Sequence, residues 1–129
     1  MGFELEGQNF VVTGAAKGIG LAISRKLSEL GAHVSGWDLD SSSMSRESIF
    51  SHCVRVDVSN EKSVASATEE TIKNFGILHG LIANAGVNGP TKPVWEYSLE
   101  EWQWVISVDL TGVFLTTRAV LNHLREQEY

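Results

Sequence analysis

The chain has 129 residues and a formal net charge of −6; 43% of its residues are hydrophobic and 20% are charged, which is typical of one soluble globular domain. The negative charge argues against nucleic acid or an anionic membrane as the main partner. With a single cysteine, no signal peptide and no run approaching the about 18 apolar residues of a membrane span, we expect a cytoplasmic protein without an internal disulfide.

The first predicted elements are a strand over residues 8–12, a glycine-rich turn and a helix. The turn reads Thr-Gly-Ala-Ala-Lys-Gly-Ile-Gly over residues 13–20. A strand, a glycine turn and a helix in this order form a cradle for a diphosphate, which sits at the positive end of the helix dipole. In such a cradle Gly14 permits a sharp turn, Gly18 lets backbone N–H groups approach the diphosphate, and Gly20 lets the helix lie close to the strand. The alternative is a glycine-rich turn without a ligand.

The helix after the turn is predicted to bury one apolar face, made of Ile19, Ala22, Ile23, Leu27 and Leu30. Gly31 ends this helix, and a second strand over residues 32–38 follows. Its last residue, Asp38, lies near the roughly 20-residue offset expected of the carboxylate that binds an adenosine ribose. The charge of Asp38 would repel the 2′-phosphate of NADP, whereas Lys17 would attract it. We give Asp38 more weight and favour NAD over NADP.

The rest of the chain continues the alternation. We predict a loop with at most one helical turn over residues 41–51, then a third strand over 53–58. A helix capped by Ser59 or Asn60 leads to a fourth strand over 80–83. A capping box of Ser98 and Glu101 begins a last helix that reaches nearly to the C-terminus.

These elements predict an α/β fold with a Rossmann-like, doubly wound parallel sheet in the order 3-2-1-4. With about four strands such a sheet is incomplete, because dinucleotide-binding sheets commonly have about six. The last helix is apolar nearly all round, so we expect missing chain, a second subunit or both to cover its outer side.

Four motifs in order resemble the short-chain dehydrogenase/reductase family, over the whole chain. They are the TGxxxGIG loop at residues 13–20, the acid Asp38, the pair Asp57-Val58 and the turn 84–86, Asn-Ala-Gly. The resemblance implies an NAD(H)-dependent oxidoreductase that interconverts a secondary alcohol and a carbonyl by hydride transfer. It also implies that residues 1–129 are the N-terminal cofactor-binding half of a single-domain enzyme.

The resemblance implies a set of cofactor contacts and no metal site. The glycine turn would hold the diphosphate, the end of the second strand the adenosine ribose, the third motif the adenine, and the fourth the nicotinamide side. The set is Gly14, Ala16, Lys17, Gly18, Ile19, Gly20, Asp38, Leu39, Asp57, Val58, Asn84, Ala85 and Gly86. Two alternatives remain: Asp57 could cap the turn before the next helix, and the turn 84–86 could be free of ligand.

Two departures from the family pattern concern catalysis. Asp109 stands where the family has an Asn that helps to hold a water in a proton relay, so a relay role for Asp109 is one hypothesis. The other is a structural place at a helix kink beside Gly112. The family's catalytic Ser and Tyr-x-x-x-Lys are missing, since Tyr97 is followed at the fourth position by Glu101, and Tyr129 is the last residue. We therefore expect a fragment that binds NAD weakly, if at all, and does not turn over.

The favoured function is thus the cofactor half of an NAD(H)-dependent oxidoreductase. The alternatives are a non-catalytic dinucleotide-binding or sensing module, an inactive fragment, and a structural protomer that associates through its last helix. Family members pair through this helix, so the resemblance implies a homodimer or homotetramer for the complete protein. The substrate is a small alcohol or carbonyl compound that the sequence does not identify.

Overall fold

The computed structural model describes residues 4–127, so Tyr129 lies outside the described residues. A four-stranded parallel sheet has the order β3-β2-β1-β4, which confirms the predicted topology. The strands are β1 (Asn9–Thr13), β2 (His33–Asp38), β3 (His52–Arg55) and β4 (Gly80–Ile82). The helices are α1 (Gly18–Glu29), α2 (Ser41–Met44), α3 (Glu61–Phe75), α4 (Leu99–Ile106) and α5 (Gly112–Leu124). A 3-10 turn, Val94–Glu96, precedes α4, and a π-helical segment, Ser107–Thr111, joins α4 to α5.

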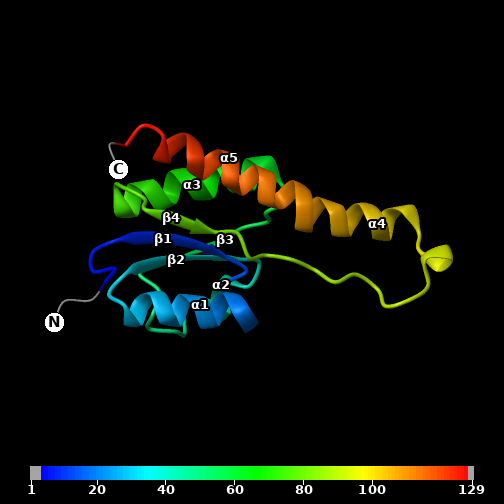
Figure 1. Ribbon diagram of the computed structural model, residues 1–129, viewed down its shortest axis with the longest axis horizontal. Helices are drawn as coiled ribbons and strands as arrows, with labels where there is room; N and C mark the ends of the chain where they lie inside the picture. Colours follow the sequence, from blue (N-terminus) through cyan, green and yellow to red (C-terminus); the bar gives the residue numbers. More distant parts are fainter. Residues whose placement is uncertain (1–3, 128–129) are drawn as a thin grey trace.

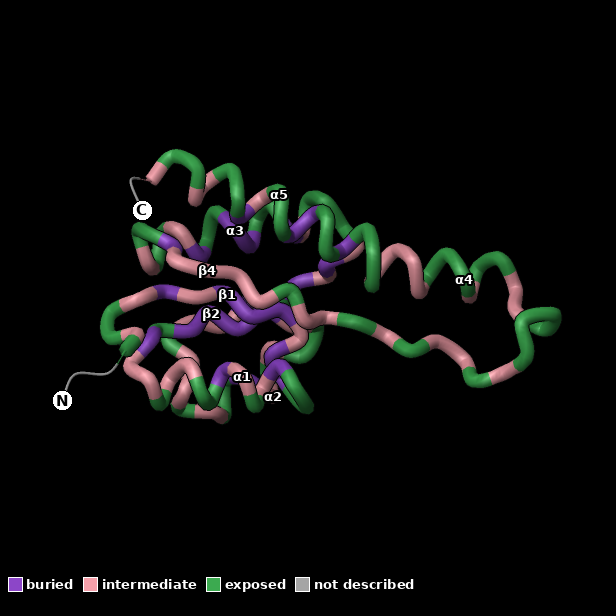
Figure 2. Tube along the Cα trace, viewed as in Figure 1, coloured by how far each residue is buried: buried purple, intermediate pink, exposed green. Residues whose placement is uncertain are grey.

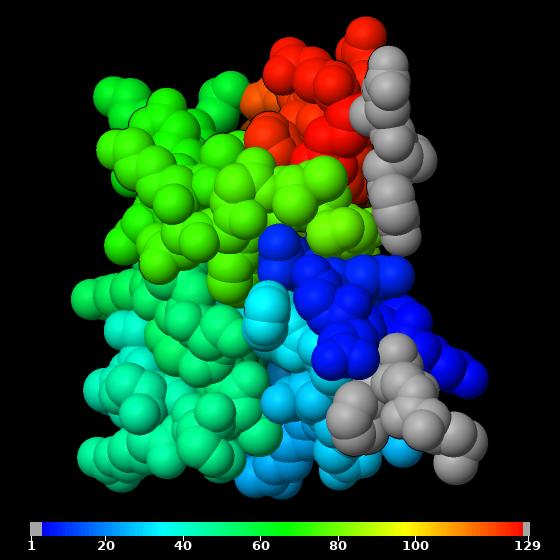
Figure 3. All heavy atoms as spheres, turned by 90° about the vertical axis from the view of Figure 1, so that its left-hand side faces the viewer, coloured from blue at the N-terminus to red at the C-terminus, as the bar shows by residue number. Residues whose placement is uncertain are grey.

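Helices cover both faces of the sheet (Figure 1). The helices α1 and α2 lie on one face, and α3 and α5 lie on the other. Because the strands are parallel, their carboxyl ends meet at one edge of the sheet. Figure 3 shows the opposite end of the molecule, where the C-terminal segment and α3 lie above the N-terminal segment.

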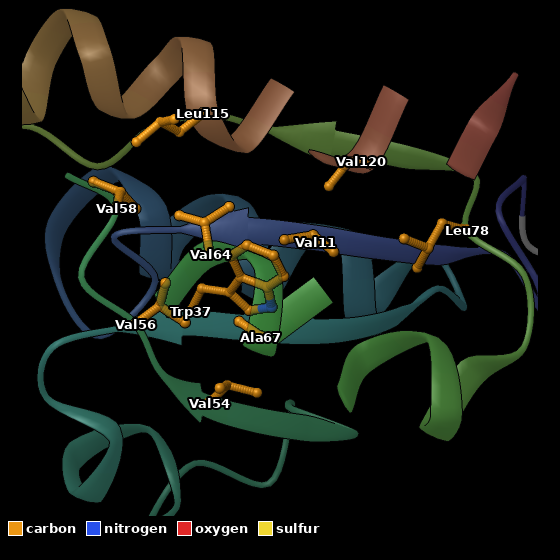
Figure 4. Close-up of a cluster of buried hydrophobic side chains, with 10 residues drawn as sticks. All are labelled: Val11, Trp37, Val54, Val56, Val58, Val64, Ala67, Leu78, Leu115 and Val120. Atoms are coloured by element: carbon orange, nitrogen blue, oxygen red, sulfur yellow. The ribbon is translucent and has the colours of Figure 1, made fainter. Parts of the chain in front are cut away.

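Side chains of the sheet alternate between two hydrophobic cores, as the pleat of a strand requires. Val12 and Val34 belong to the core that includes Met44 of α2. Val11 and Trp37 point into the larger core under α3 and α5 (Figure 4). Trp37 is fully buried, and its indole N–H donates to Thr71 Oγ1 at 3.1 Å, so the polar edge of the ring is satisfied.

The predicted helix ends are confirmed. Asn60 caps α3 by accepting a hydrogen bond from the Ser63 amide at 2.9 Å. Ser98 and Glu101 form the expected capping box of α4. Gly31 follows the end of α1 with a φ of +92°, a conformation that glycine adopts at low cost.

The third strand is shorter than the predicted range 53–58. Its pairing with β2 ends at Arg55, which lies opposite Asp38, the last residue of β2. The Val56 amide makes a last hydrogen bond to the Asp38 carbonyl oxygen at 3.0 Å, and Asp57 then closes a turn by accepting a hydrogen bond from the Ser59 amide at 3.0 Å. The end of a strand therefore depends on its partner as well as on its own apolar residues.

The predicted buried face of α1 is wrong at its N-terminal end. Ile19 is 72% exposed and Ala22 is exposed, whereas Gly20 and Ser24 are buried. A Cβ on Gly20 would lie 2.1 Å from the carbonyl oxygen of Gly14. The helix thus approaches the strand through its glycine, and this orientation leaves Ile19 outside the core.

The last three helical segments form one continuous helix, Leu99–Leu124, which is long and apolar enough to cross a membrane by length and composition. The sequence-based expectation that no stretch approaches a membrane span is therefore wrong for this helix. A core helix of a soluble protein passes the same test of length and composition.

In α5, Leu115 and Val120 are buried. In contrast, α4 carries no buried residue and extends beyond the sheet (Figures 1 and 2). The expected uncovered apolar side is present, since Leu110 is 64% and Phe114 57% exposed.

Candidate functional site

The carboxyl edge of the sheet brings together residues that follow all four strands. The glycine loop, residues 14–20, follows β1, and Asp38 ends β2. Asp57 comes shortly after β3, and Asn84 comes shortly after β4. In doubly wound sheets, ligands bind in the crevice at this edge.

Two glycines of the loop lie where no side chain fits. Gly14 has a φ of +64°, and a Cβ there would lie 2.9 Å from the Cα of Ala85. Gly20 packs against the carbonyl of Gly14, as its predicted close approach requires. Gly18 has a φ of +58°, but a Cβ there would meet no atom within 4 Å, so this residue faces open space.

The first turn of α1 has no side-chain cap. Lys17 occupies the N-cap position without a side-chain hydrogen bond to the helix, and the first turn contains no acidic residue. The N–H groups of this turn and the positive end of the helix dipole are therefore available to an anion. A diphosphate fits this arrangement, because backbone donors, the open space at Gly18 and the exposed Ile19 meet at one end of α1.

Asp38 lies half-buried beside the glycine loop. Its Oδ2 accepts a hydrogen bond from the Ala16 amide at 3.0 Å, and its Oδ1 accepts one from the Asp40 amide at 3.0 Å. A carboxylate has about four acceptor positions, so about two remain for other donors such as ribose hydroxyls. Leu39, which follows Asp38, is 60% exposed.

Asn84 and Thr13 join the ends of β4 and β1. Thr13 Oγ1 accepts hydrogen bonds from the amides of Asn84 and Ala85, each at 2.9 Å. Asn84 Nδ2 donates to the carbonyl oxygens of Thr13 at 3.1 Å and Gly14 at 3.3 Å. Asn84 therefore joins the start of the glycine loop to the chain that follows β4. Thr13 is missing from the predicted site residues, although the threonine of the loop motif was the available signal.

The pair Asp57-Val58 makes structural contacts. Asp57 Oδ1 accepts hydrogen bonds from the amide and the hydroxyl of Ser59, at 3.0 and 2.6 Å. This is the turn-capping contact that we considered as an alternative. Val58 is buried, and its Cγ2 lies 2.8 Å from where a Cβ on Gly112 would stand. The side chain of Val58 thus packs on the start of α5.

Asp109 lies in the π-helical segment and reaches the turn after β4. Its Oδ1 accepts a hydrogen bond from the Val87 amide at 2.7 Å, and a Cβ on Gly86 would lie 3.3 Å from the same oxygen. Single π-turns inside α-helices are frequent at functional sites. The structure therefore brings Asp109 to the turn 84–86, although the two are far apart in the sequence.

The clear pKa shifts within residues 4–127 fall outside the predicted site. Burial lowers the pKa of His52, against the opposing effect of Glu70, and burial raises the pKa of Cys53. Hydrogen bonds from Lys92 and Ser98 lower the pKa of Glu101. Within the same residues, no group of three or more His, Cys, Asp or Glu side chains is placed to hold a metal ion.

The model of the short chain dehydrogenase family matches residues 8–129. A 2-dehydro-3-deoxy-L-rhamnonate dehydrogenase (NAD(+)) from Sphingomonas sp. (strain SKA58) is 33% identical over 126 residues, which cover 95% of this chain and 51% of that protein. A cis-4-hydroxycyclohexanecarboxylate dehydrogenase from Sinomonas cyclohexanicum is 40% identical over 120 residues, which cover 88% of this chain and 48% of that protein.

Solved structures show the same fold. A 3-ketoacyl-(acyl-carrier-protein) reductase from Brucella melitensis complexed with NADH has a TM-score of 0.90 and 29% identity, over 95% of this chain and 52% of its own. A short chain dehydrogenase/reductase from Burkholderia phymatum in complex with NAD has a TM-score of 0.87 and 33% identity, over 94% of this chain and 45% of its own. The chain thus spans about half the length of the proteins it matches.

Proposed function

The chain belongs to the short-chain dehydrogenase/reductase family, and we propose that it forms the NAD(H)-binding half of an oxidoreductase that interconverts a secondary alcohol and a carbonyl. The observation that carries this proposal is the uncapped N-terminus of α1, which lies next to an open glycine loop and Asp38. The two structural neighbours that contain NADH or NAD support it by analogy.

We assign each part of the dinucleotide to a different group of residues at the carboxyl edge of the sheet. The N–H groups of Gly18, Ile19 and Gly20 at the start of α1 bind the diphosphate, while Gly14, Ala16 and Lys17 shape the rest of the cradle, since the amides of Gly14 and Ala16 already donate within the protein. Asp38 and Leu39 bind the adenosine ribose, and the backbone of Asp57 and Val58 borders the adenine. Asn84, Ala85 and Gly86 flank the nicotinamide side. The bound dinucleotide supplies the hydride chemistry, while these residues bind and orient it.

We propose NAD rather than NADP as the cofactor. The Asp38 carboxylate stands at the end of β2, where a 2′-phosphate would bring a second negative charge close to it. Lys17 is exposed at the start of α1 and would attract that phosphate. We give Asp38 more weight, because its carboxylate lies where the 2′ group of the adenosine ribose would bind.

Residues 1–129 alone are proposed to bind the dinucleotide weakly, if at all, and without turnover, because they contain no Tyr-x-x-x-Lys to act as general acid or base. The complete protein is proposed to be a cytoplasmic homodimer or homotetramer.

A non-catalytic dinucleotide-binding or sensing module is the second candidate, and the carboxylate of Asp109 at the relay position favours it. An assay of the intact protein with NAD and small secondary alcohols separates the two, because only the oxidoreductase produces NADH.

Two matched glycine variants test the proposed diphosphate cradle. Gly18 and Gly76 have φ values of +58° and +77°, and a Cβ at either would meet nothing within 4 Å. Gly18→Ala and Gly76→Ala both put a side chain on a residue with positive φ, but only the first places a methyl group in the cradle. In calorimetric titrations with NAD, we expect Gly18→Ala to raise the Kd by about tenfold or more, a change of about 1.4 kcal/mol, and Gly76→Ala to leave it unchanged. Equal Kd values for Gly18→Ala and the wild type would contradict the proposal.

A further inference from the structure

We infer that Asp38 is a positioning residue that holds the glycine loop and the start of α2 in place before any cofactor binds. The inference depends on the proposed function only for the identity of the ligand. The contacts themselves join groups of this chain alone: Asp38 Oδ2 accepts from the Ala16 amide and Asp38 Oδ1 from the Asp40 amide, both at 3.0 Å.

The Ala16 amide lies where the backbone of β2 no longer holds the loop. The carbonyl oxygen of Trp37 accepts hydrogen bonds from the amides of Gly14 at 2.8 Å and Ala15 at 3.4 Å. The next amide, that of Ala16, bonds to the Asp38 side chain instead. Ala16 is buried, so its N–H would lose a hydrogen-bond partner without the carboxylate, and an unpaired buried donor is costly.

The other oxygen of the carboxylate holds the turn that leads into α2. It accepts the amide of Asp40, and the side chain of Asp40 in turn caps α2 by accepting the Ser43 amide at 3.1 Å. Met44 at the end of α2 is fully buried in the core on this face of the sheet. One carboxylate therefore connects the glycine loop to a helix that is anchored in the core.

Counting acceptors shows why an aspartate is needed here. The two backbone donors use different oxygens of Asp38, and about two acceptor positions are left for the ribose hydroxyls. The side chain of an asparagine has one acceptor oxygen and one NH₂ group, which only donates. Asp38→Asn, although similar in shape, therefore loses either the loop contact or the turn contact. A substitution made to admit the 2′-phosphate of NADP would loosen the glycine loop at the same time.

Amide hydrogen exchange tests the loop contact without any ligand. In the intact protein, we expect Asp38→Ala to speed exchange of both the Ala16 and Asp40 amides, and Asp38→Asn to speed at least one of them, by about tenfold. Asp40→Asn is the matched control, because it removes the same charge two positions away and keeps the backbone amide and a good N-cap. Unchanged exchange at both amides in Asp38→Ala would overturn the inference, whereas general acceleration across the sheet would assign Asp38 to global stability and overturn it as well.

Two nucleotides separate the loop contact from the ribose contact. We would titrate the wild type and Asp38→Asn with ADP and with 2′,3′-dideoxy-ADP, which lacks the ribose hydroxyls. A positioning role predicts that Asp38→Asn weakens binding of both nucleotides, by several-fold for the dideoxy compound. If Asp38→Asn weakens only ADP, Asp38 acts through the ribose alone and the inference is wrong. If the wild type binds neither nucleotide, the proposed function fails, while the exchange experiment still decides the loop contact.

Discussion

The Asp109 carboxylate accepts a hydrogen bond from the Val87 amide at 2.7 Å, which fastens the π-helical segment to the turn after β4. Asp109→Asn keeps an acceptor oxygen at this position, whereas Asp109→Leu does not. Because Asp109 is exposed in the described chain, we expect Asp109→Leu to lower the free energy of unfolding by about 1 kcal/mol and Asp109→Asn by less than about half of that. Urea denaturation of the intact protein measures both, and equal losses would contradict the contact.

A relay role for Asp109 makes a further prediction that stability does not. In the intact protein, Asp109→Asn removes an ionisable group from the proposed relay, so the pH dependence of turnover should change. The measurement is the pH profile of kcat with NAD and a secondary alcohol that the intact protein oxidises. A profile identical to that of the wild type would assign Asp109 to positioning the turn 84–86 alone.

The Thr13 hydroxyl is expected to be essential for the junction of β1 and β4. Thr13 is buried, and its Oγ1 is the acceptor for two backbone amides. Thr13→Val leaves these amides without their acceptor, so we expect a loss of about 3 kcal/mol in the free energy of unfolding. Thr13→Ser keeps the hydroxyl and should cost about 1 kcal/mol, for the lost methyl group alone. Equal losses in urea denaturation would show that the hydroxyl contributes nothing.

The fold was predictable because its signals are local. The alternation of strands and helices, the glycine loop and the caps at Asn60 and Ser98 all follow from short stretches of sequence. The errors arise where a distant element decides. The end of β3 depends on where β2 stops, and the exposed side of α1 depends on the approach of Gly20 to the Gly14 carbonyl.

The candidate site was predictable only in its residue types. The motifs indicated Asp38, Asn84 and Asp109, but not which atoms they contact. The bonds from Asp38 to the Ala16 amide and from Asp109 to the Val87 amide join segments far apart in the chain. Such contacts depend on the packing of whole elements, and no sequence spacing encodes them.

Acid should destabilise the protein through His52. Its Nδ1 lies 2.8 Å from Ser35 Oγ, and its Nε2 lies 3.9 Å from Glu70 Oε1, whose charge only partly offsets the effect of burial. Because the folded pKa lies below the ordinary value of 6.5, the unfolded chain binds the proton more readily. The contribution of His52 to the free energy of unfolding is therefore complete above the ordinary pKa of 6.5. It is lost as the pH falls below 6.5 and through the lower pKa of the folded protein.

His52→Asn removes the titrating ring and keeps a polar side chain near Ser35. We expect its urea midpoint to fall less than that of the wild type when the pH is lowered from about 7 to about 5. Identical pH dependence for His52→Asn and the wild type would contradict the assignment.

The exposed apolar side of α5 should control association of the complete protein. Phe114 is 57% exposed and Leu121 49% exposed, a large amount of apolar surface for one helix. We expect Phe114→Glu to shift a dimer or tetramer to smaller species in sedimentation velocity experiments. Ser66→Glu, which adds the same charge at an exposed position of α3, should not. A monomeric wild type would refute the expected homo-oligomer.

The most direct test of dinucleotide binding at the carboxyl edge is an NAD titration of the intact, ¹⁵N-labelled protein, followed by its amide resonances. We expect saturable shifts concentrated in the glycine loop and near Asp38, Asp57 and Asn84, and weaker binding of NADP than of NAD. Saturation with shifts at the opposite edge of the sheet, or no saturation with either dinucleotide, would contradict it.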